Sequence, residues 1–381
     1  MTSKTALILS GGGARGAYQV GVLKGLSEIL KGTQVKSPFQ ILSGVSAGAI
    51  NCAQLACNIE NFDIAVEKLV FLWSKISSEQ VFKTDFMSLN KFSLGLFGEK
   101  KLNAVLDTSP LRTLIEKNCD FSKIQKNLDQ NIIESVIITA NNYNQNSAIS
   151  FIQKQKTKTS ATTTWHDSRR HAELTEINAS HIMASSAIPM LFPPIQVESD
   201  FYGDGCLRNN TPCSPSIRMG AEKLFVIGVR TQSVAENENY IKGIPSEKNS
   251  TPTEPSMIRI LNTLLNAVLL DSVEQDVQRI QRINDLVSKA DAKTRALHDL
   301  KTIPALCISP SENIGEIARH YAHHLPRLLR MTISTFGNLD EASEILSYLL
   351  FNSQFCSKLI DMGYQDSLKS KDEILKFFEV G

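Results

Sequence analysis

The stretch LILSGGGARGAYQVGVLKGL, residues 7–26, contains the pattern that decides the fold. The apolar run Thr5–Leu9 is short and continuous, as expected of a strand buried on both faces. After the glycines, apolar residues recur at helical spacing as far as Ile29, and Gly32 follows as a stop signal. The stretch therefore predicts a strand, a glycine loop and a helix in direct succession.

Residues 39–57 repeat this plan. Phe39–Ser43 indicates a second buried strand, the loop Gly44–Gly48 follows it, and an alanine-rich stretch to Cys57 favours a helix. Further strands are expected at Ile132–Ala140, Ala148–Gln153, Phe225–Val229 and Ile303–Ile308. Alternating strands and helices predict an α/β fold with a mostly parallel central sheet and helices on both faces. The strand beyond residue 300 predicts that the C-terminal part completes the same sheet.

The hydrophobic content, net charge and cysteine spacing of the chain limit which class of protein it can be and which partners it can bind. The chain has 381 residues, 42% of them hydrophobic, which is enough for a large core without disulfide support. Its formal charge of +1 provides no strong field for nucleic acid. Seven scattered cysteines without a C-x-x-C pair favour a reducing compartment. The expected location is the cytoplasm, with peripheral contact to a membrane left open and the oligomeric state undetermined.

The glycine loop also matches G-x-G-x-x-G, a pattern typical of dinucleotide-binding sites. Such a site needs an acidic residue at the end of the second strand, where this chain has Ser43 to Ser46. A phosphate-binding P-loop needs lysine followed by serine or threonine, whereas Ala17 and Tyr18 follow the last glycine. Both nucleotide-binding interpretations lack their essential partner, and we expect no cofactor.

The pattern G-x-S-x-G at Gly44–Gly48 points to nucleophilic chemistry instead. It lies between a predicted strand and a predicted helix, where a sharp turn would present the hydroxyl of Ser46. Acyl transfer from a serine creates an oxyanion that needs backbone N–H donors. The loop Gly11–Gly13 lies beside Ser46 if the two strands are neighbours, so it is the expected oxyanion hole. Arg15 either adds positive charge there or anchors the loop.

The base that activates Ser46 is the harder residue to find. No histidine follows a clear strand and stands beside glycines; the seven are His166, His171, His181, His298, His320, His323 and His324. The last three form a helix face that we interpret as solvated, and no metal site is expected. Asp204 lies between two glycines after an aromatic pair, and alone this segment would be a plain turn.

Together these elements resemble the patatin-like phospholipase family. Its G-G-G-x-R-G loop matches Gly11–Gly16, its G-x-S-x-G elbow matches Gly44–Gly48, and its D-G-G or D-G-A motif matches Asp204 and Gly205. Cys206 stands where the family has glycine or alanine. The segment from Ala184 to Pro194 also resembles the region before the aspartate motif. Motif positions that support the site by this resemblance are Arg15, Gly16, Gly44, Gly48 and Gly205.

The resemblance implies a patatin-like three-layer sandwich and a Ser-Asp dyad without a catalytic histidine. Ser46 is then the nucleophile, Asp204 its general base, and Gly11, Gly12 and Gly13 the oxyanion donors. The implied substrate is a phospholipid or lysophospholipid, hydrolysed without calcium. Two alternatives stay open: an α/β-hydrolase esterase with a Ser-His-Asp triad, and a non-catalytic module that binds nucleotide or lipid.

The resemblance is convincing over residues 4–230, which we expect to be the catalytic core. Residues 231–256 are polar and predict a linker or long surface loop, and residues 257–381 predict a mainly helical part that completes or caps the core. Within it, Met257–Ala290 predicts one or two amphipathic helices. A cap is predicted around Phe86–Phe97. Leu325–Phe336 favours a core or cap helix over one at a membrane, and Ile188–Ile195 favours core packing over an acyl groove.

Overall fold

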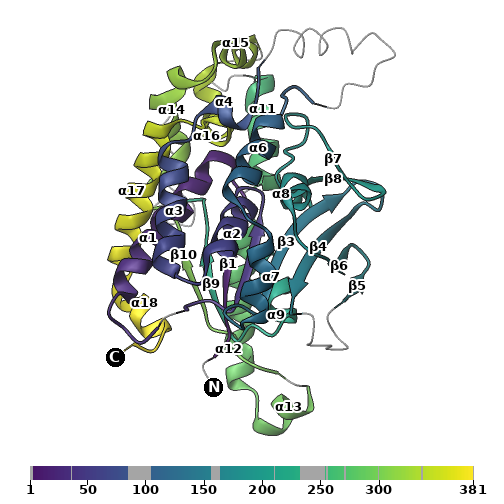
Figure 1. The fold of residues 1–381 in the computed structure, drawn as a ribbon, viewed down its shortest axis with the longest axis vertical. Coiled ribbons are helices and arrows are strands. Elements are labelled where there is room, and N and C mark those ends of the chain that lie inside the picture. Colours follow the sequence, from purple (N-terminus) through teal and green to yellow (C-terminus); the bar gives the residue numbers. More distant parts are fainter. Residues whose placement is uncertain are drawn as a thin grey trace.

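The computed structural model describes residues 3–35, 37–84, 104–155, 164–209, 211–231, 254, 256–269, 272–298, 300–335 and 338–380. A ten-stranded sheet forms the middle layer, in the order β10-β9-β1-β2-β3-β4-β6-β5, with β8 paired to β3 and β7 paired to β8 (Figure 1). The strands are β1 (Thr5–Leu9), β2 (Ile41–Val45), β3 (Ser135–Asn142), β4 (Ser147–Lys154), β5 (His166–Asp167), β6 (Arg170–Leu174), β7 (Ile195–Val197), β8 (Asp200–Asp204), β9 (Lys223–Ile227) and β10 (Ala305–Ile308).

Helices cover both faces of this sheet (Figure 1). They are α1 (Gly16–Leu30), α2 (Ala47–Asn58), α3 (Phe62–Ser74), α4 (Ser78–Val81), α6 (Ser109–Asn118), α7 (Ser122–Asp129), α8 (Ala179–Ser185), α9 (Ser214–Arg218), α11 (Met257–Leu269), α12 (Ser272–Lys289), α13 (Ala292–Leu297), α14 (Ile314–Tyr321), α15 (Arg327–Thr335), α16 (Ser343–Leu349), α17 (Ser353–Lys369) and α18 (Lys371–Phe377). Short 3-10 turns are η1 (Gly13–Arg15), η2 (Gly205–Leu207), η3 (Ala322–His324) and η4 (Leu339–Ala342).

Strand β1 shows why the predicted sheet needs two helical layers. Successive side chains of a strand point to opposite faces, and all five residues of β1 are buried. Leu7 and Leu9 enter the core shared with α1, α2, α3 and α17, whereas Ala6 and Ile8 enter the core shared with α9 and α12. The α/β fold with a mostly parallel sheet and a three-layer arrangement is therefore confirmed.

Pairing of the strands also confirms the expected position of the last one. Strands β2, β1, β9 and β10 run parallel to one another, so β10 extends the sheet formed by the N-terminal strands. Several boundaries differ from the prediction by two or three residues. For example, β2 begins at Ile41 instead of Phe39, because Ile41 is the first residue to pair with β1, opposite Ala6.

The part of the chain after residue 256 is mainly helical. The predicted amphipathic region Met257–Ala290 forms α11 and α12. In the predicted helix Leu325–Phe336, helix α15 buries Leu329 and Ile333 in the main core and leaves Met331 exposed. That burial favours the core-helix interpretation. Among the described residues, no helix combines the length and apolar character needed to cross a bilayer. The predicted cap at Phe86–Phe97 and nearly all of the predicted linker at 231–256 lie outside the described residues.

Candidate active site

Ser46 occupies a sharp turn between β2 and α2. Its backbone angles, φ 55° and ψ −124°, are rarely adopted by a residue with a side chain and mark a strained turn. The flanking glycines are required by close backbone approach. A Cβ on Gly44 would lie 2.3 Å from the carbonyl oxygen of Gly48, and one on Gly48 would lie 2.2 Å from that of Leu9. The G-x-S-x-G pattern thus forms the expected nucleophile elbow.

Asp204 contacts Ser46, although the two residues lie 158 positions apart in the sequence. It is the last residue of β8, which runs antiparallel to β3 and pairs Asp204 with Ala140. The Ser46 hydroxyl donates a hydrogen bond to Oδ2 of Asp204 at 2.6 Å, and Oδ1 accepts one from the N–H of Cys206 at 2.9 Å. Both side chains are buried. The structure therefore brings together the two residues that the sequence singled out as nucleophile and base.

Burial changes the acidity of Asp204. Removal of the carboxylate from water raises its pKa to about 6, although hydrogen bonds from Ser46 and from Cys206 oppose this shift. An aspartate with an ordinary pKa is a weak base, and a higher pKa makes it a better acceptor for the serine proton. At neutral pH the carboxylate still remains mostly ionised, as proton abstraction requires.

Two further serines hold the elbow in place, and sequence reasoning did not assign them a role. Ser185, the last residue of α8, accepts the Ser46 N–H at 2.9 Å and donates to the carbonyl oxygen of Thr139 at 2.6 Å. Ser186 donates to the carbonyl oxygen of Ser46 at 3.1 Å. These bonds tie the strained turn to α8 and β3. The only sequence signal was that this serine pair lies in the segment resembling the family.

The glycine loop lies directly against the elbow. A Cβ on Gly11 would lie 2.3 Å from the Cys206 sulfur and 2.9 Å from Cβ of Ser46, so only a glycine fits there. Gly13 has φ +57°, in the left-handed region. Within the described part of the chain, no group accepts a hydrogen bond from the N–H of Gly12 or of Gly13. The loop thus has the closeness to Ser46 that an oxyanion hole requires.

Arg15 anchors this loop. Its side chain is buried, and Nε donates to the hydroxyl of Ser347 at 2.8 Å while Nη1 donates to the carbonyl oxygen of Val229 at 3.3 Å. The guanidinium also forms an ion pair with Glu344. Of the two roles expected for Arg15, the structure supports the anchor, because its donors are engaged with α16 and with the residues after β9.

Cys206 fits the turn in place of the smaller family residue. The thiol is buried between Gly11 and the carboxylate. Burial raises its pKa well above the ordinary value, and the negative charge of Asp204 adds to this effect. The thiol therefore stays neutral, and a second negative charge beside Asp204 is avoided.

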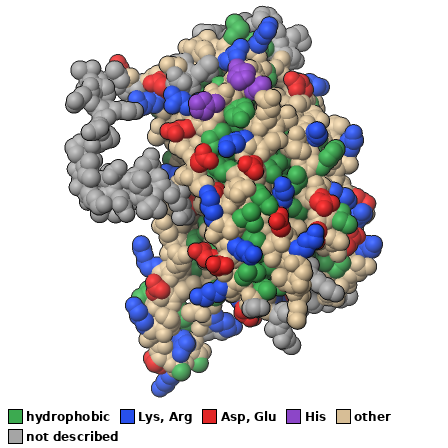
Figure 2. Space-filling view, turned by 90° about the vertical axis from the view of Figure 1, so that its left-hand side faces the viewer, with side chains coloured by type: hydrophobic (Ala, Val, Ile, Leu, Met, Phe, Trp, Pro, Cys, Tyr) green, Lys and Arg blue, Asp and Glu red, His purple; other side chains and the backbone are tan. Residues whose placement is uncertain are grey.

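No histidine among the described residues forms a hydrogen bond with Ser46 or Asp204, so the triad alternative finds no geometric support. His181 is buried, accepts the Asn178 N–H at 3.1 Å and packs on Phe151; burial lowers its pKa to about 4. Figure 2 shows histidines gathered at one end of a face where charges of both signs are mixed. The described residues contain no group of three or more His, Cys, Asp or Glu placed to hold a metal ion.

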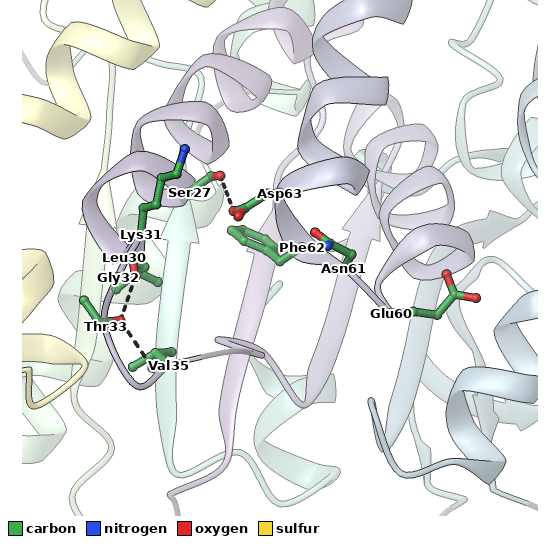
Figure 3. Close-up of a pocket in the computed structure, with 10 residues that line it drawn as sticks. All are labelled: Ser27, Leu30, Lys31, Gly32, Thr33, Val35, Glu60, Asn61, Phe62 and Asp63. Carbon is green, nitrogen blue, oxygen red and sulfur yellow. Dashed lines mark hydrogen bonds between the residues drawn. The ribbon is translucent and has the colours of Figure 1, made fainter.

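A cavity of about 300 Å³ lies away from this chemistry (Figure 3). It is formed where α1 ends and α3 begins, and Ser27 donates to Asp63 across it at 2.5 Å. The loop after α1 leads into the start of β2, whereas Ser46 follows the end of β2. The cavity therefore lies at the end of the sheet where β2 begins, whereas the dyad lies at the end where β2 finishes.

The apolar segment Ile188–Ile195 does not form one continuous wall. Ile188 and Phe192 are buried in the main core, which agrees with the core-packing interpretation. Met190 lies between them with φ 67°, and 62% of its surface is exposed. Only Met190 is thus presented to solvent over most of its surface.

Comparisons with known proteins agree with the motifs. A family model described as patatin-like phospholipase matches residues 7–217, more than half of the chain. The uncharacterized protein R571 of Acanthamoeba polyphaga mimivirus is 26% identical over 209 residues, which are 54% of this chain and 59% of that protein. The chain therefore spans less than two thirds of that relative's length.

Two solved structures show a weak likeness. VipD from Legionella pneumophila matches 98% of this chain and 67% of its own, with 13% identity and a TM-score of 0.36. Human GIVD cytosolic phospholipase A2, solved with methyl gamma-linolenyl fluorophosphonate, matches 99% of this chain and 59% of its own, with 12% identity and a TM-score of 0.40.

Proposed function

The chain belongs to the patatin-like phospholipase family, and we propose that it is a lipid acyl hydrolase that releases fatty acid from a phospholipid or lysophospholipid. The observation that carries this proposal is the hydrogen bond of 2.6 Å from the Ser46 hydroxyl to a buried Asp204. A serine on a strained elbow, paired with a carboxylate of raised pKa, is suited to nucleophilic attack on an ester.

In the acylation step, Asp204 accepts the hydroxyl proton while Ser46 Oγ forms a bond to the carbonyl carbon of the ester. The electron pair of the carbonyl moves to its oxygen, and the N–H groups of the loop Gly11–Gly13 stabilise the resulting oxyanion. When the oxyanion collapses, the bond to the alcohol breaks. The proton held by Asp204 passes to the departing alkoxide, leaving an acyl-enzyme and a neutral alcohol.

In the deacylation step, Asp204 accepts a proton from water, and the water oxygen attacks the acyl-enzyme carbonyl. The second oxyanion occupies the same loop. Its collapse breaks the bond to Ser46 Oγ, which regains its proton from Asp204 and releases the fatty acid. A single carboxylate thus serves as base and acid in both halves of the reaction, without a histidine.

Contact with a membrane surface is part of this proposal, because a lipid substrate resides there. Helix α11 buries Ile258 but leaves Met257, Ile260 and Leu264 largely exposed, and it contacts η2, which follows Asp204. Apolar side chains at this spacing lie on one face of the helix. The proposal predicts that the protein sediments with phospholipid vesicles; protein that stays in the supernatant would contradict it.

The decisive experiment measures fatty acid release from mixed phospholipid and lysophospholipid vesicles. Ser46→Ala and Asp204→Asn are each expected to abolish release while the circular dichroism spectrum is kept. Matched controls are Ser216→Ala and Asp366→Asn, which alter a buried serine and a buried aspartate away from the dyad. Full activity in either dyad variant would refute the assignment.

A further inference from the structure

Helix α16 lies against the glycine loop, although it is outside the residues 7–217 that match the family. A Cβ on Gly13 would lie only 2.3 Å from the carbonyl oxygen of Tyr348. The guanidinium of Arg15 lies over the Tyr348 ring, 5.3 Å from its centroid. The C-terminal part therefore places an aromatic side chain directly behind the loop that we assign to the oxyanion.

The hydroxyl of Tyr348 is buried without a partner. The residue is 4% exposed, and its oxygen forms no hydrogen bond with any described residue. Buried polar groups nearly always have partners, because leaving one unpaired destabilises the folded state. A phenylalanine would fill the same space without that cost. Tyr18, also buried, shows the ordinary arrangement, since its hydroxyl bonds to Asp366 at 3.1 Å.

The surroundings of this hydroxyl belong to the active site. Burial raises the pKa of Tyr348 well above its ordinary value; Arg15 opposes the shift, and Cys206, Glu344 and Asp204 add to it. The geometry points to the same region, because the backbone of Tyr348 lies against Gly13 and its ring lies against the guanidinium of Arg15. The hydroxyl remains protonated at neutral pH, so it has an O–H to donate.

We propose that Tyr348 is a catalytic residue whose O–H donates a hydrogen bond to the oxyanion formed on attack by Ser46, together with the N–H groups of the glycine loop. The inference rests on the proposed function, because the oxyanion exists only if an ester is cleaved. The unpartnered hydroxyl then gains its acceptor in the transition state, where such a bond accelerates the reaction. The ligand group it fits is the carbonyl oxygen of an acyl ester.

The test compares Tyr348→Phe with Tyr18→Phe, each of which removes only one buried hydroxyl. For Tyr348→Phe we expect kcat to fall about 100-fold with little change in KM, and Tm to stay equal or rise because an unpaired group is removed. For Tyr18→Phe we expect the reverse: kcat is kept, and Tm falls because the bond to Asp366 is lost. A loss of kcat without a loss of Tm indicates a catalytic hydroxyl, whereas a loss of Tm without a loss of kcat indicates a hydroxyl that only stabilises the fold.

Labelling of Ser46 by a fluorophosphonate gives a second readout on folded protein. It builds a tetrahedral centre whose phosphoryl oxygen occupies the oxyanion position, so Tyr348→Phe should slow labelling while Tyr18→Phe should not. If the wild-type protein hydrolyses lipid esters and Tyr348→Phe keeps its kcat and its labelling rate, only the role of Tyr348 is overturned. If the wild type neither hydrolyses lipid esters nor labels at Ser46, the proposed function falls with it.

Discussion

Asp204, the base that we propose, lies in a site that disfavours its charge. The carboxylate is buried, and its two oxygens accept hydrogen bonds from the Ser46 hydroxyl and from the N–H of Cys206, while the Cys206 thiol also interacts with it. Burial therefore outweighs these bonds and leaves the pKa at about 6. At the scale of single residues, the same desolvation that makes the base effective makes it costly to the folded state.

The first prediction concerns the pH dependence of activity. Proton abstraction needs the ionised carboxylate, so kcat/KM should rise with pH through about 6 and then reach a plateau. The measurement is kcat/KM for a soluble short-chain ester between pH 4 and 8, with buffers of constant ionic strength. A bell-shaped profile, or a midpoint near 4, would contradict the assigned base.

The second prediction concerns stability. Because the folded pKa of Asp204 is raised above its unfolded value, the native state binds more protons between about pH 4 and 6, and its stability falls as pH rises through that range. Asp204→Asn removes the buried charge. It should be more stable than the wild type at pH 8 by up to about 3 kcal/mol, and this gain should vanish below pH 4. Urea unfolding of the variant and the wild type at pH 8 and below pH 4 measures this difference in stability. A variant less stable than the wild type at pH 8 would contradict the prediction.

At the scale of elements, close backbone packing joins helix α1 to the C-terminal part of the chain. Helix α1, which begins at the glycine loop, packs along α17 from the C-terminal part. A Cβ on Gly21 would lie 2.1 Å from the carbonyl oxygen of Ile360, and one on Gly363 would lie 2.3 Å from that of Tyr18. Glycines thus allow backbone contact between the two helices.

The third prediction follows from this contact. Gly21→Ala would force α1 and α17 apart, because backbone cannot move aside as a flexible side chain can, and should lower the free energy of unfolding by about 1–3 kcal/mol. Lys31→Ala, at the exposed residue that directly follows the same helix, is the control and should have little effect. Urea unfolding measures both. If Gly21→Ala had the same free energy of unfolding as the wild type, the close approach of α1 and α17 would be contradicted.

At the scale of the whole molecule, the parts before and after residue 231 share one sheet and one core. Strand β10 pairs with β9, and residues of α14, α16 and α17 enter the same core cluster as Leu7 and Leu42. The family model ends at residue 217. We infer that the family-matched region depends on the C-terminal part to cover its sheet.

The fourth prediction tests this dependence. A fragment of residues 1–231 would expose the edge of β9 and the face of the sheet and α1 that α17 covers, so it should aggregate or lack a cooperative thermal transition. Gel filtration and calorimetry of the fragment, beside the full chain, check this. A monomeric fragment that unfolds cooperatively would show that the core is complete without residues 232–381.

The sequence by itself determined the first strand, the nucleophile elbow and the glycine loop, because these depend on neighbouring residues. Glycine is required where backbones touch within a few positions, as at Gly44 and Gly48, and a buried strand leaves a continuous apolar run. The choice of Asp204 as base came from the family resemblance. Only the β3–β8 pairing, which involves residues far apart in sequence, explains how it reaches Ser46.

The tertiary structure alone decided the contacts of Arg15 and Ser185, and it alone led to the role that we propose for Tyr348. Arg15 had two expected roles, and its contacts with α16 selected the anchor. Tyr348 has no local signal, because a tyrosine among apolar residues of a helix is typical of a core. Whether its hydroxyl finds a partner depends on what packs around it, and Tyr348 packs against Gly13 and Arg15, which lie near the other end of the sequence. Packing between distant segments therefore placed these groups around the candidate site.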